Sequence, residues 1–264
     1  MDLQLKGKTA FISGSTQGIG YAIAKQLLQE GAKVLINGRK QEVVDAAVEK
    51  LKREVNDAAV SGIAANFDNA DEVKILITQL SDIDILVNNV GIFEPKAFVD
   101  ITDEDWLRFF EVNVLSAVRL SRSLFPQMLA KNWGRIIFIS SESAVNIPEE
   151  MIHYGMTKTA LHAISRGLSE LTKATNITVN TIMPGPTASE GMVDFIQKLA
   201  DAKGITAKQE EEDFFKTVRP SSLIQRFATV EEVANLVAYI SSPLASATNG
   251  SALRVDGGVV KTIF

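Results

Sequence analysis

Hydrophobic residues along this chain follow two alternating patterns, one typical of β-strands and one typical of α-helices. Short apolar runs bounded by turn residues predict seven strands, at 8–13, 32–37, 60–67, 84–90, 134–141, 177–185 and 252–258. Between most of them, apolar residues recur every three or four positions, as Ile19, Ile23 and Leu27 do, which predicts helices. The chain therefore alternates between strand and helix along most of its length.

The predicted helices differ in length and in how they end. The first should stop at Gly31, in the position after a helix that favours glycine. The others are a second helix carrying Val44, Val48, Leu51 and Val55, a short one at about 70–80, a long helical region at about 102–130, and one that opens at Tyr154 and places Leu161, Ile164, Leu168 and Leu171 on one face.

Alternating strands and helices predict βαβ units and a parallel sheet. Continuous apolar strands such as "IIFI" suit a sheet covered on both faces. We expect an α/β fold consisting of one doubly wound (Rossmann) domain over residues 1–264, with about seven parallel strands and helices on both faces. The segment 187–228 interrupts the alternation as an excursion, in which "EEED" (210–213) is interpreted as a solvated helix face.

Composition narrows the class of protein. The formal net charge of −5 among 264 residues argues against nucleic acid and anionic membranes as partners. Neither a signal peptide nor an apolar run of membrane-spanning length is present, so a cytoplasmic protein is expected. The chain has no cysteine, and its two histidines, His153 and His162, are not accompanied by other residues in a metal-binding pattern. No metal site is therefore predicted.

A glycine-rich loop, "SGSTQGIG" at 13–20, follows the first strand and opens the first helix. Glycines at 14, 18 and 20 allow a tight turn and a close approach of the backbone to a ligand. The N-terminus of the helix offers unpaired N–H groups and a positive dipole end. This context predicts a site for the pyrophosphate of a dinucleotide rather than a purely structural turn.

The position that selects between NAD and NADP lies about 20 residues further on. An aspartate there would bind the 2′-hydroxyl of NAD, but the sequence reads Asn37-Gly38-Arg39. The guanidinium of Arg39 could bind a 2′-phosphate, which favours NADP(H), with NAD as the alternative. A solvated helix start, shared with Lys40, is the competing interpretation of Arg39.

In "YGMTK", Tyr154 and Lys158 are four residues apart, which places them on one face of a helix. A phenol is a poor base at neutral pH, and a nearby cation should lower its pKa. The pair is thus a candidate acid–base device.

Four features in order, the loop at 13–20, "NNVG" at 88–91, Ser141 and "YGMTK", resemble the classical short-chain dehydrogenase/reductase family. Ser141 lies 13 residues before Tyr154, the spacing of that family, while "MPGPT" (183–187) and "VDGG" (255–258) resemble two further segments. The resemblance runs from Gly7 to Gly258. Ser13, Gln17, Val90 and Thr157 depart from the common residues, and Gln17 replaces the basic residue of many NADP-dependent members.

The resemblance implies an oxidoreductase acting on CH–OH groups that moves hydride between NADP(H) and a carbonyl or alcohol. Tyr154 would be its general acid or base, and Lys158 would hold the nicotinamide ribose. Ser141, preferred over Ser143, would fix the position of the carbonyl oxygen. Asn113 would hold a water that links Lys158 to solvent. The implied cofactor contacts are Gly14, Ser15, Thr16, Gln17, Gly18, Ile19, Arg39, Asp68, Asn69, Asn89, Gly91, Tyr154, Lys158, Pro184, Gly185 and Thr187.

Several points stay open at this stage. Asp68 is either the adenine contact or the N-cap of the next helix, a role that Asn69 or Asp71 could also take. The substrate pocket should include Ser141, Tyr154 and Phe93 with Glu94, Val145, Ile147, Met151 and parts of 187–228, for a small ketone, 3-oxoacyl, steroid-like or sugar-like substrate. A cofactor-sensing regulator and a sugar-nucleotide epimerase or dehydratase are the alternative functions.

A homo-oligomer, a tetramer or a dimer, is expected. The helix from Tyr154 carries small residues at Ala160, Ala163 and Gly167 on a second side, which suits close packing against another subunit. A face buried within the core is the competing interpretation.

Overall fold

The computed structural model describes residues 1–263 and contains one sheet of seven parallel strands, ordered β3-β2-β1-β4-β5-β6-β7. The predicted doubly wound fold is therefore confirmed. The strands are β1 (Thr9–Ile12), β2 (Lys33–Gly38), β3 (Val60–Ala64), β4 (Ile85–Asn88), β5 (Gly134–Ile139), β6 (Ile177–Pro184) and β7 (Ala252–Val255).

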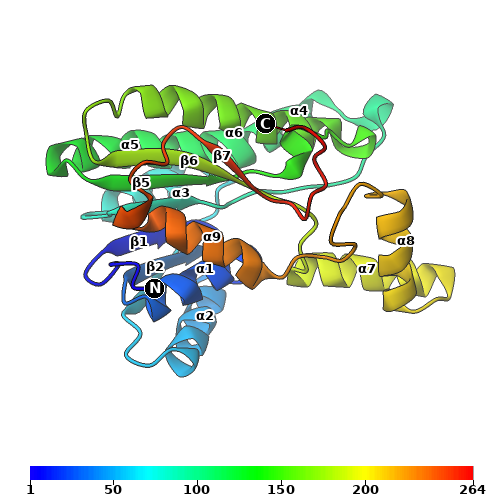
Figure 1. Ribbon diagram of the computed structural model, residues 1–264, viewed down its shortest axis with the longest axis horizontal. Helices are drawn as coiled ribbons and strands as arrows, with labels where there is room; N and C mark the ends of the chain where they lie inside the picture. The colour runs from blue at the N-terminus through cyan, green and yellow to red at the C-terminus, as the bar shows by residue number, and fades with distance from the viewer. Residues whose placement is uncertain (264) are drawn as a thin grey trace.

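Helices cover both faces of the sheet (Figure 1). On one face lie α1 (Gly18–Gln29), α2 (Gln41–Glu54) and α9 (Val230–Ser241), and on the other α3 (Ala70–Gln79), α5 (Ser116–Lys131) and α6 (Ile152–Glu170). The remaining elements are α4 (Asp103–Phe110), α7 (Glu190–Lys203), α8 (Ala207–Thr217) and the short turns η1 (Phe98–Asp100), η2 (Glu111–Leu115), η3 (Glu142–Ala144), η4 (Glu149–Met151) and η5 (Pro243–Ala245).

The two faces of the sheet bury separate hydrophobic clusters. Successive strand residues point to opposite faces, so Ile12 joins the cluster with α1, α2 and α9, whereas its neighbour Phe11 joins the cluster with α3, α5 and α6. All six residues of β5 are buried. Burial on both faces explains why this strand is continuously apolar and not alternating.

Most element boundaries follow the predicted pattern, with two differences. The first helix does end before Gly31, which has a φ of 82°. The long region at about 102–130 is not one regular helix, because the π-helical turn η2 separates α4 from α5. Helix α9, at 230–241, was not predicted at all.

The excursion at 187–228 folds as two helices that extend beyond the end of the sheet, at the right of Figure 1. Ile196, Phe215 and Phe227 form a small core between them. The interpretation of "EEED" as a solvated face is wrong for Glu210, which is buried with both carboxylate oxygens 2.7 Å from Lys203 Nζ. An ion pair allows this carboxylate to lie inside.

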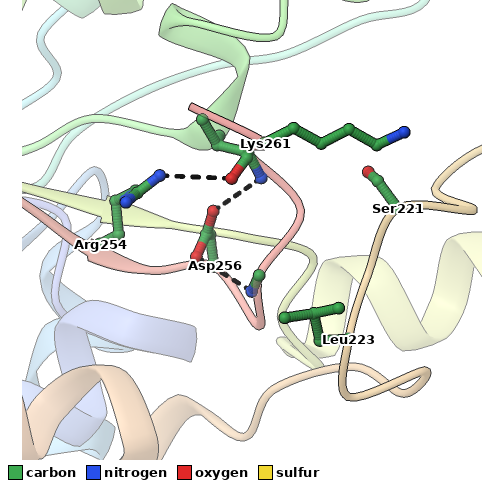
Figure 2. A pocket seen from close by; sticks show the side chains of 7 residues that line it. Ser221, Leu223, Arg254, Asp256 and Lys261 are labelled. Atoms are coloured by element: carbon green, nitrogen blue, oxygen red, sulfur yellow. Dashed lines mark hydrogen bonds between the residues drawn. The ribbon is translucent and has the colours of Figure 1, made fainter. Parts of the chain in front are cut away.

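The C-terminal segment fastens the end of the excursion to the sheet. Figure 2 shows Asp256 beside a cavity of about 440 Å³, where its carboxylate accepts hydrogen bonds from the backbone N–H groups of Gly258 and Val260. The turn formed in this way presents the Gly257 carbonyl to Leu223 N–H at 2.8 Å. The "VDGG" sequence thus serves to hold the segment that follows α8.

Candidate active site

The candidate catalytic residues lie where the carboxyl ends of neighbouring strands meet. Ser141 follows β5, and its Oγ accepts a hydrogen bond from Ser143 N–H at 3.1 Å. Tyr154 and Lys158 lie in the first turns of α6, which packs against η3 and β6. The structure brings Ser141 and Tyr154 together, since both line one cavity, and the Ser141 hydroxyl lowers the pKa of the phenol.

The electrostatics of Tyr154 differ from the sequence prediction. Burial raises the pKa of Tyr154 to about 12; the Ser141 hydroxyl lowers it, Glu142 raises it and Arg219 lowers it. The expected net lowering of this pKa is therefore not found, because burial is the largest contribution and raises it. Desolvation of the phenolate outweighs the favourable contacts, and the ammonium lies 5.6 Å from the ring centroid.

Lys158 is itself buried, and its surroundings fix the direction of its side chain. Its Nζ donates a hydrogen bond to the Ile139 carbonyl at 3.0 Å. Burial lowers the pKa of Lys158 to about 8. A Cβ at Gly91 would lie 3.1 Å from this ammonium, a tight contact, so glycine at this position leaves the amine more room.

Asn113 lies in the π-helical turn η2 and is fully buried. Its Oδ1 accepts from Ile92 N–H at 2.7 Å, and its Nδ2 donates to the Ile92 carbonyl and to Thr157 Oγ1, each at 3.0 Å. The side chain therefore ties the segment after β4 to α6. Both N–H groups of the amide and one lone pair of its oxygen are thus used within the protein, and a role of Asn113 in holding a water stays a prediction.

The glycine loop has the shape that a pyrophosphate requires. Gly14 and Gly18 have φ values of 61° and 60°, a region that favours glycine. A side chain at Gly20 would meet the Gly14 carbonyl at 2.5 Å. No side chain caps α1 at Gln17, so the first N–H groups of the helix are left for a ligand. The residues present fit a dinucleotide phosphate.

Two predicted cofactor contacts turn out to shape the loop from within. The Ser15 hydroxyl is buried, donates to the Ile12 carbonyl and accepts from Asn37 N–H. Asn89 donates from Nδ2 to the carbonyls of Ser13 and Gly14, at 3.1 and 2.8 Å. Their side chains are therefore used for positioning.

Arg39 follows β2 and is exposed. It makes no hydrogen bond or ion pair within residues 1–263, so its guanidinium is available. Asn37, two residues earlier, is buried and accepts from Gly14 N–H through Oδ1 at 3.1 Å. A side chain at Gly38 would meet Thr16 Cγ2 at 2.6 Å, which brings Thr16 close to the end of β2.

The segment after β3 resolves one open alternative. Asn69 is the N-cap of α3, because its side chain accepts from the N–H groups of Asp71 and Glu72. Asp68 is therefore not the cap; it is exposed and lies 3.5 Å from Arg108. Contact between these residues and adenine stays a prediction.

A cavity of about 400 Å³ adjoins the candidate catalytic residues. As predicted, it is lined by Ser141, Tyr154, Phe93, Met151 and parts of the excursion. Contrary to prediction, Glu94, Val145 and Ile147 are exposed and do not line it. Pro184, Gly185 and Thr187 contribute the wall beyond β6, and a side chain at Gly185 would meet the Asp256 carbonyl at 2.6 Å.

Sequence reasoning missed the charged residues of this cavity. Glu142, Glu210 and Arg219 all line it, and all three are buried. Only the position of Glu142, next to Ser141, could have signalled its place. Nothing in the sequence marks Arg219 as its partner 77 residues away.

The remaining polar candidates play other parts. Ser143, the rival of Ser141, also lines the cavity but does not act on the pKa of Tyr154. His153 is buried against Phe109, with ring centroids 4.0 Å apart. His162 Nε2 lies 2.9 Å from Ser140 Oγ. Within residues 1–263, no group of three or more metal-ligating side chains occurs, and no helix has the length and apolar character needed to span a membrane.

Comparison with known proteins identifies the family. The family described as Enoyl-(Acyl carrier protein) reductase matches residues 14–260. "Uncharacterized oxidoreductase YvrD" of Bacillus subtilis (strain 168) is 52% identical, and "Uncharacterized oxidoreductase YvaG" of the same strain is 47% identical, each over the full length of both chains. A crystal structure of L-sorbose reductase from Gluconobacter frateurii, complexed with NADPH and L-sorbose, superposes with a TM-score of 0.93 at 32% identity, covering all of both chains.

This chain belongs to the classical short-chain dehydrogenase/reductase family of oxidoreductases. The resemblance drawn from the sequence is confirmed.

The burial of Lys158 generates a prediction about stability and pH. Its pKa falls from 10.5 to about 8 on folding, which corresponds to about 3 kcal/mol. This cost is fully present below about pH 8 and disappears as the pH rises past 10.5, above which the lysine is neutral in both states. The unfolding free energy of Lys158→Met minus that of the wild type should therefore decrease by about 3 kcal/mol across this interval in urea titrations.

Lys173→Met provides the control, because this lysine is exposed and its charge stays hydrated in the fold. Its difference from the wild type should be flat with pH. A flat profile for Lys158→Met as well would contradict the desolvation argument.

Proposed function

We propose that this protein is an NADP(H)-dependent carbonyl reductase and alcohol dehydrogenase in which Tyr154 is the general acid and base. The observation that carries the proposal is the position of the Tyr154 phenol beside Ser141 in a cavity that also includes Ile19 of the glycine loop. The residues of the loop can hold the pyrophosphate, and the cofactor supplies hydride when bound.

The state of the phenol favours reduction. With a pKa of about 12, Tyr154 holds its proton at neutral pH and can donate it to the alkoxide that develops at a reduced carbonyl carbon. Ser141 orients the carbonyl oxygen towards the phenol. Lys158 lies close to Gly91 on the cofactor side, where its Nζ can bind ribose hydroxyls. In the oxidising direction Tyr154 must first lose its proton.

Two observations support NADP(H) over NAD(H). No carboxylate follows β2, where one would repel a 2′-phosphate, and the guanidinium of Arg39 is exposed and unpaired in residues 1–263. L-sorbose reductase, a relative in fold and sequence, was crystallised with NADPH.

We also propose a homo-oligomer, formed through α4 and the outer face of α6. Leu107 on α4 is 71% exposed, Phe110 is 38% exposed, and Ala163 and Gly167 on α6 face solvent. The alternative that the small-residue side of α6 is buried in the core is wrong for these two positions. The contact of α4 with α6 makes the two faces continuous.

Removal of the phenol proton should abolish turnover. Tyr154→Phe is expected to lower kcat for reduction of a panel of ketones with NADPH by about 1,000-fold, because the variant lacks the phenol that transfers a proton to the alkoxide. NADPH binding, measured by fluorescence, should stay within about threefold. Near-normal turnover in this variant would contradict the proposed acid, and lack of NADPH and NADH binding by the wild type would contradict the function as a whole.

The choice of cofactor can be tested at Arg39. Arg39→Ala should raise KM for NADPH by about 10- to 100-fold, the value of a charge-assisted hydrogen bond, and leave KM for NADH nearly unchanged. Lys40→Ala, at the neighbouring exposed position, is the matched control. Equal effects of Arg39→Ala on both cofactors would show that Arg39 does not contact a 2′-phosphate.

The oligomer can be tested at Gly167, where an added side chain meets nothing within 4 Å. Gly167→Glu should keep the fold and, at a close helix contact, dissociate the assembly. Light scattering after size-exclusion chromatography should report a mass reduced to that of a smaller species. A wild type that elutes as a monomer would contradict the proposal.

A further inference from the structure

Glu142 has a buried carboxylate at the candidate substrate cavity, and one of its two oxygens makes no hydrogen bond. The residue follows Ser141 directly, is 3% exposed and lines the same cavity as Ser141 and Tyr154. Its Oε1 accepts hydrogen bonds from Arg219 Nε at 2.9 Å and from Ser143 Oγ at 3.4 Å. Its Oε2 is buried and has no hydrogen-bond partner. A buried carboxyl oxygen without a hydrogen-bond partner is costly in a protein interior, and burial raises the pKa of Glu142 although Arg219 acts to lower it. A hydrogen-bond donor to Oε2 would stabilise the carboxylate, so one is expected to arrive from elsewhere.

The second carboxylate pair at the cavity shows what a satisfied arrangement looks like. Glu210 is as buried as Glu142 and lines the same cavity, but both of its oxygens are bound by Lys203 at 2.7 Å. Arg219 instead uses its Nε on one oxygen of Glu142 and its Nη1 on the Val218 carbonyl. The pairing is therefore incomplete at Glu142 alone.

The charges that line the cavity indicate which class of substrate group can donate a hydrogen bond to Glu142 Oε2. Three carboxylates line the cavity, those of Glu142, Glu150 and Glu210. Arg219 pairs with Glu142 and Lys203 with Glu210, whereas Glu150 makes no ion pair within residues 1–263, so the cavity has no unpaired cation and one unpaired carboxylate. An anionic substrate group would be repelled. A neutral hydroxyl can donate its proton to Oε2.

Resting on the proposed reductase function, we propose that Glu142 Oε2 accepts a hydrogen bond from a substrate hydroxyl. The hydroxyl lies close to the reacting carbonyl, because Ser141 and Glu142 are adjacent in sequence and line the same cavity as Tyr154. The substrates are then neutral hydroxyketones in the reducing direction and polyols in the oxidising direction. Glu142 is the specificity-determining residue of this subsite, and Arg219 is a positioning residue that brings the end of the excursion to it.

The test compares two ketones that differ by one group of similar size. Hydroxyacetone carries a hydroxyl where 2-butanone carries a methyl group. The measured quantity is the ratio of kcat/KM for hydroxyacetone to kcat/KM for 2-butanone with NADPH. Any effect of a substitution on the pKa of Tyr154 changes both rates and cancels in this ratio.

Replacing the pair by apolar residues should remove the preference. Glu142→Met combined with Arg219→Met leaves no unpaired buried charge, and this kind of replacement is often tolerated. The ratio should fall by about tenfold or more, because a hydrogen bond to a charged acceptor is lost. Glu210→Met combined with Lys203→Met removes an equally buried pair whose oxygens are already bound, and it should leave the ratio within about twofold of the wild type.

Glu142→Gln is the second variant, since it keeps the shape of the side chain and contact with Arg219; it should lower the ratio by a smaller factor. An unchanged ratio in both Glu142 variants would overturn the subsite, even if both rates fall together. Calorimetric binding of the two ketones to Tyr154→Phe saturated with NADPH separates this question from turnover. Equal affinities there would also overturn the subsite, whereas absence of turnover with tighter hydroxyacetone binding would count against the reductase function only.

Discussion

The parallel winding of the sheet is the constraint on which the other features depend. Every strand pair is parallel, so all seven carboxyl ends lie along one edge. The glycine loop after β1, Gly91 after β4, Ser141 after β5 and Gly185 after β6 therefore come together, although they are far apart in the chain. Ligand sites form at such edges because the connecting loops diverge there.

Burial of the site shifts the pKa values of Tyr154 and Lys158 in directions that a simple pairing of phenol and ammonium would not produce. Burial opposes charge on both side chains, so the pKa of Tyr154 rises to about 12 and that of Lys158 falls to about 8. The groups of the protein thus keep the phenol protonated at neutral pH. The Lys158 side chain is held in place by its hydrogen bond to the Ile139 carbonyl. A protonated phenol suits the proposed proton donation during reduction.

The excursion connects the substrate cavity to the C-terminal segment. Arg219, just after α8, reaches Glu142 beside Ser141, while the following residues are fastened by the turn at Asp256. A single segment therefore lines the cavity, completes a buried ion pair and is anchored to the last strand. The proposed substrate subsite and the position of this segment depend on the same few contacts.

The sequence by itself determined the alternation of strands and helices, the glycine loop, and the Ser141, Tyr154 and Lys158 spacing, because these depend on local periodicity and short-range backbone geometry. Only the tertiary structure decided which charged groups share the cavity. The contact of Glu142 with Arg219 spans 77 residues, and neither residue lies in a motif. Desolvation likewise depends on what packs around a side chain, which is why the direction of the Tyr154 pKa shift could not be derived from its neighbours in sequence.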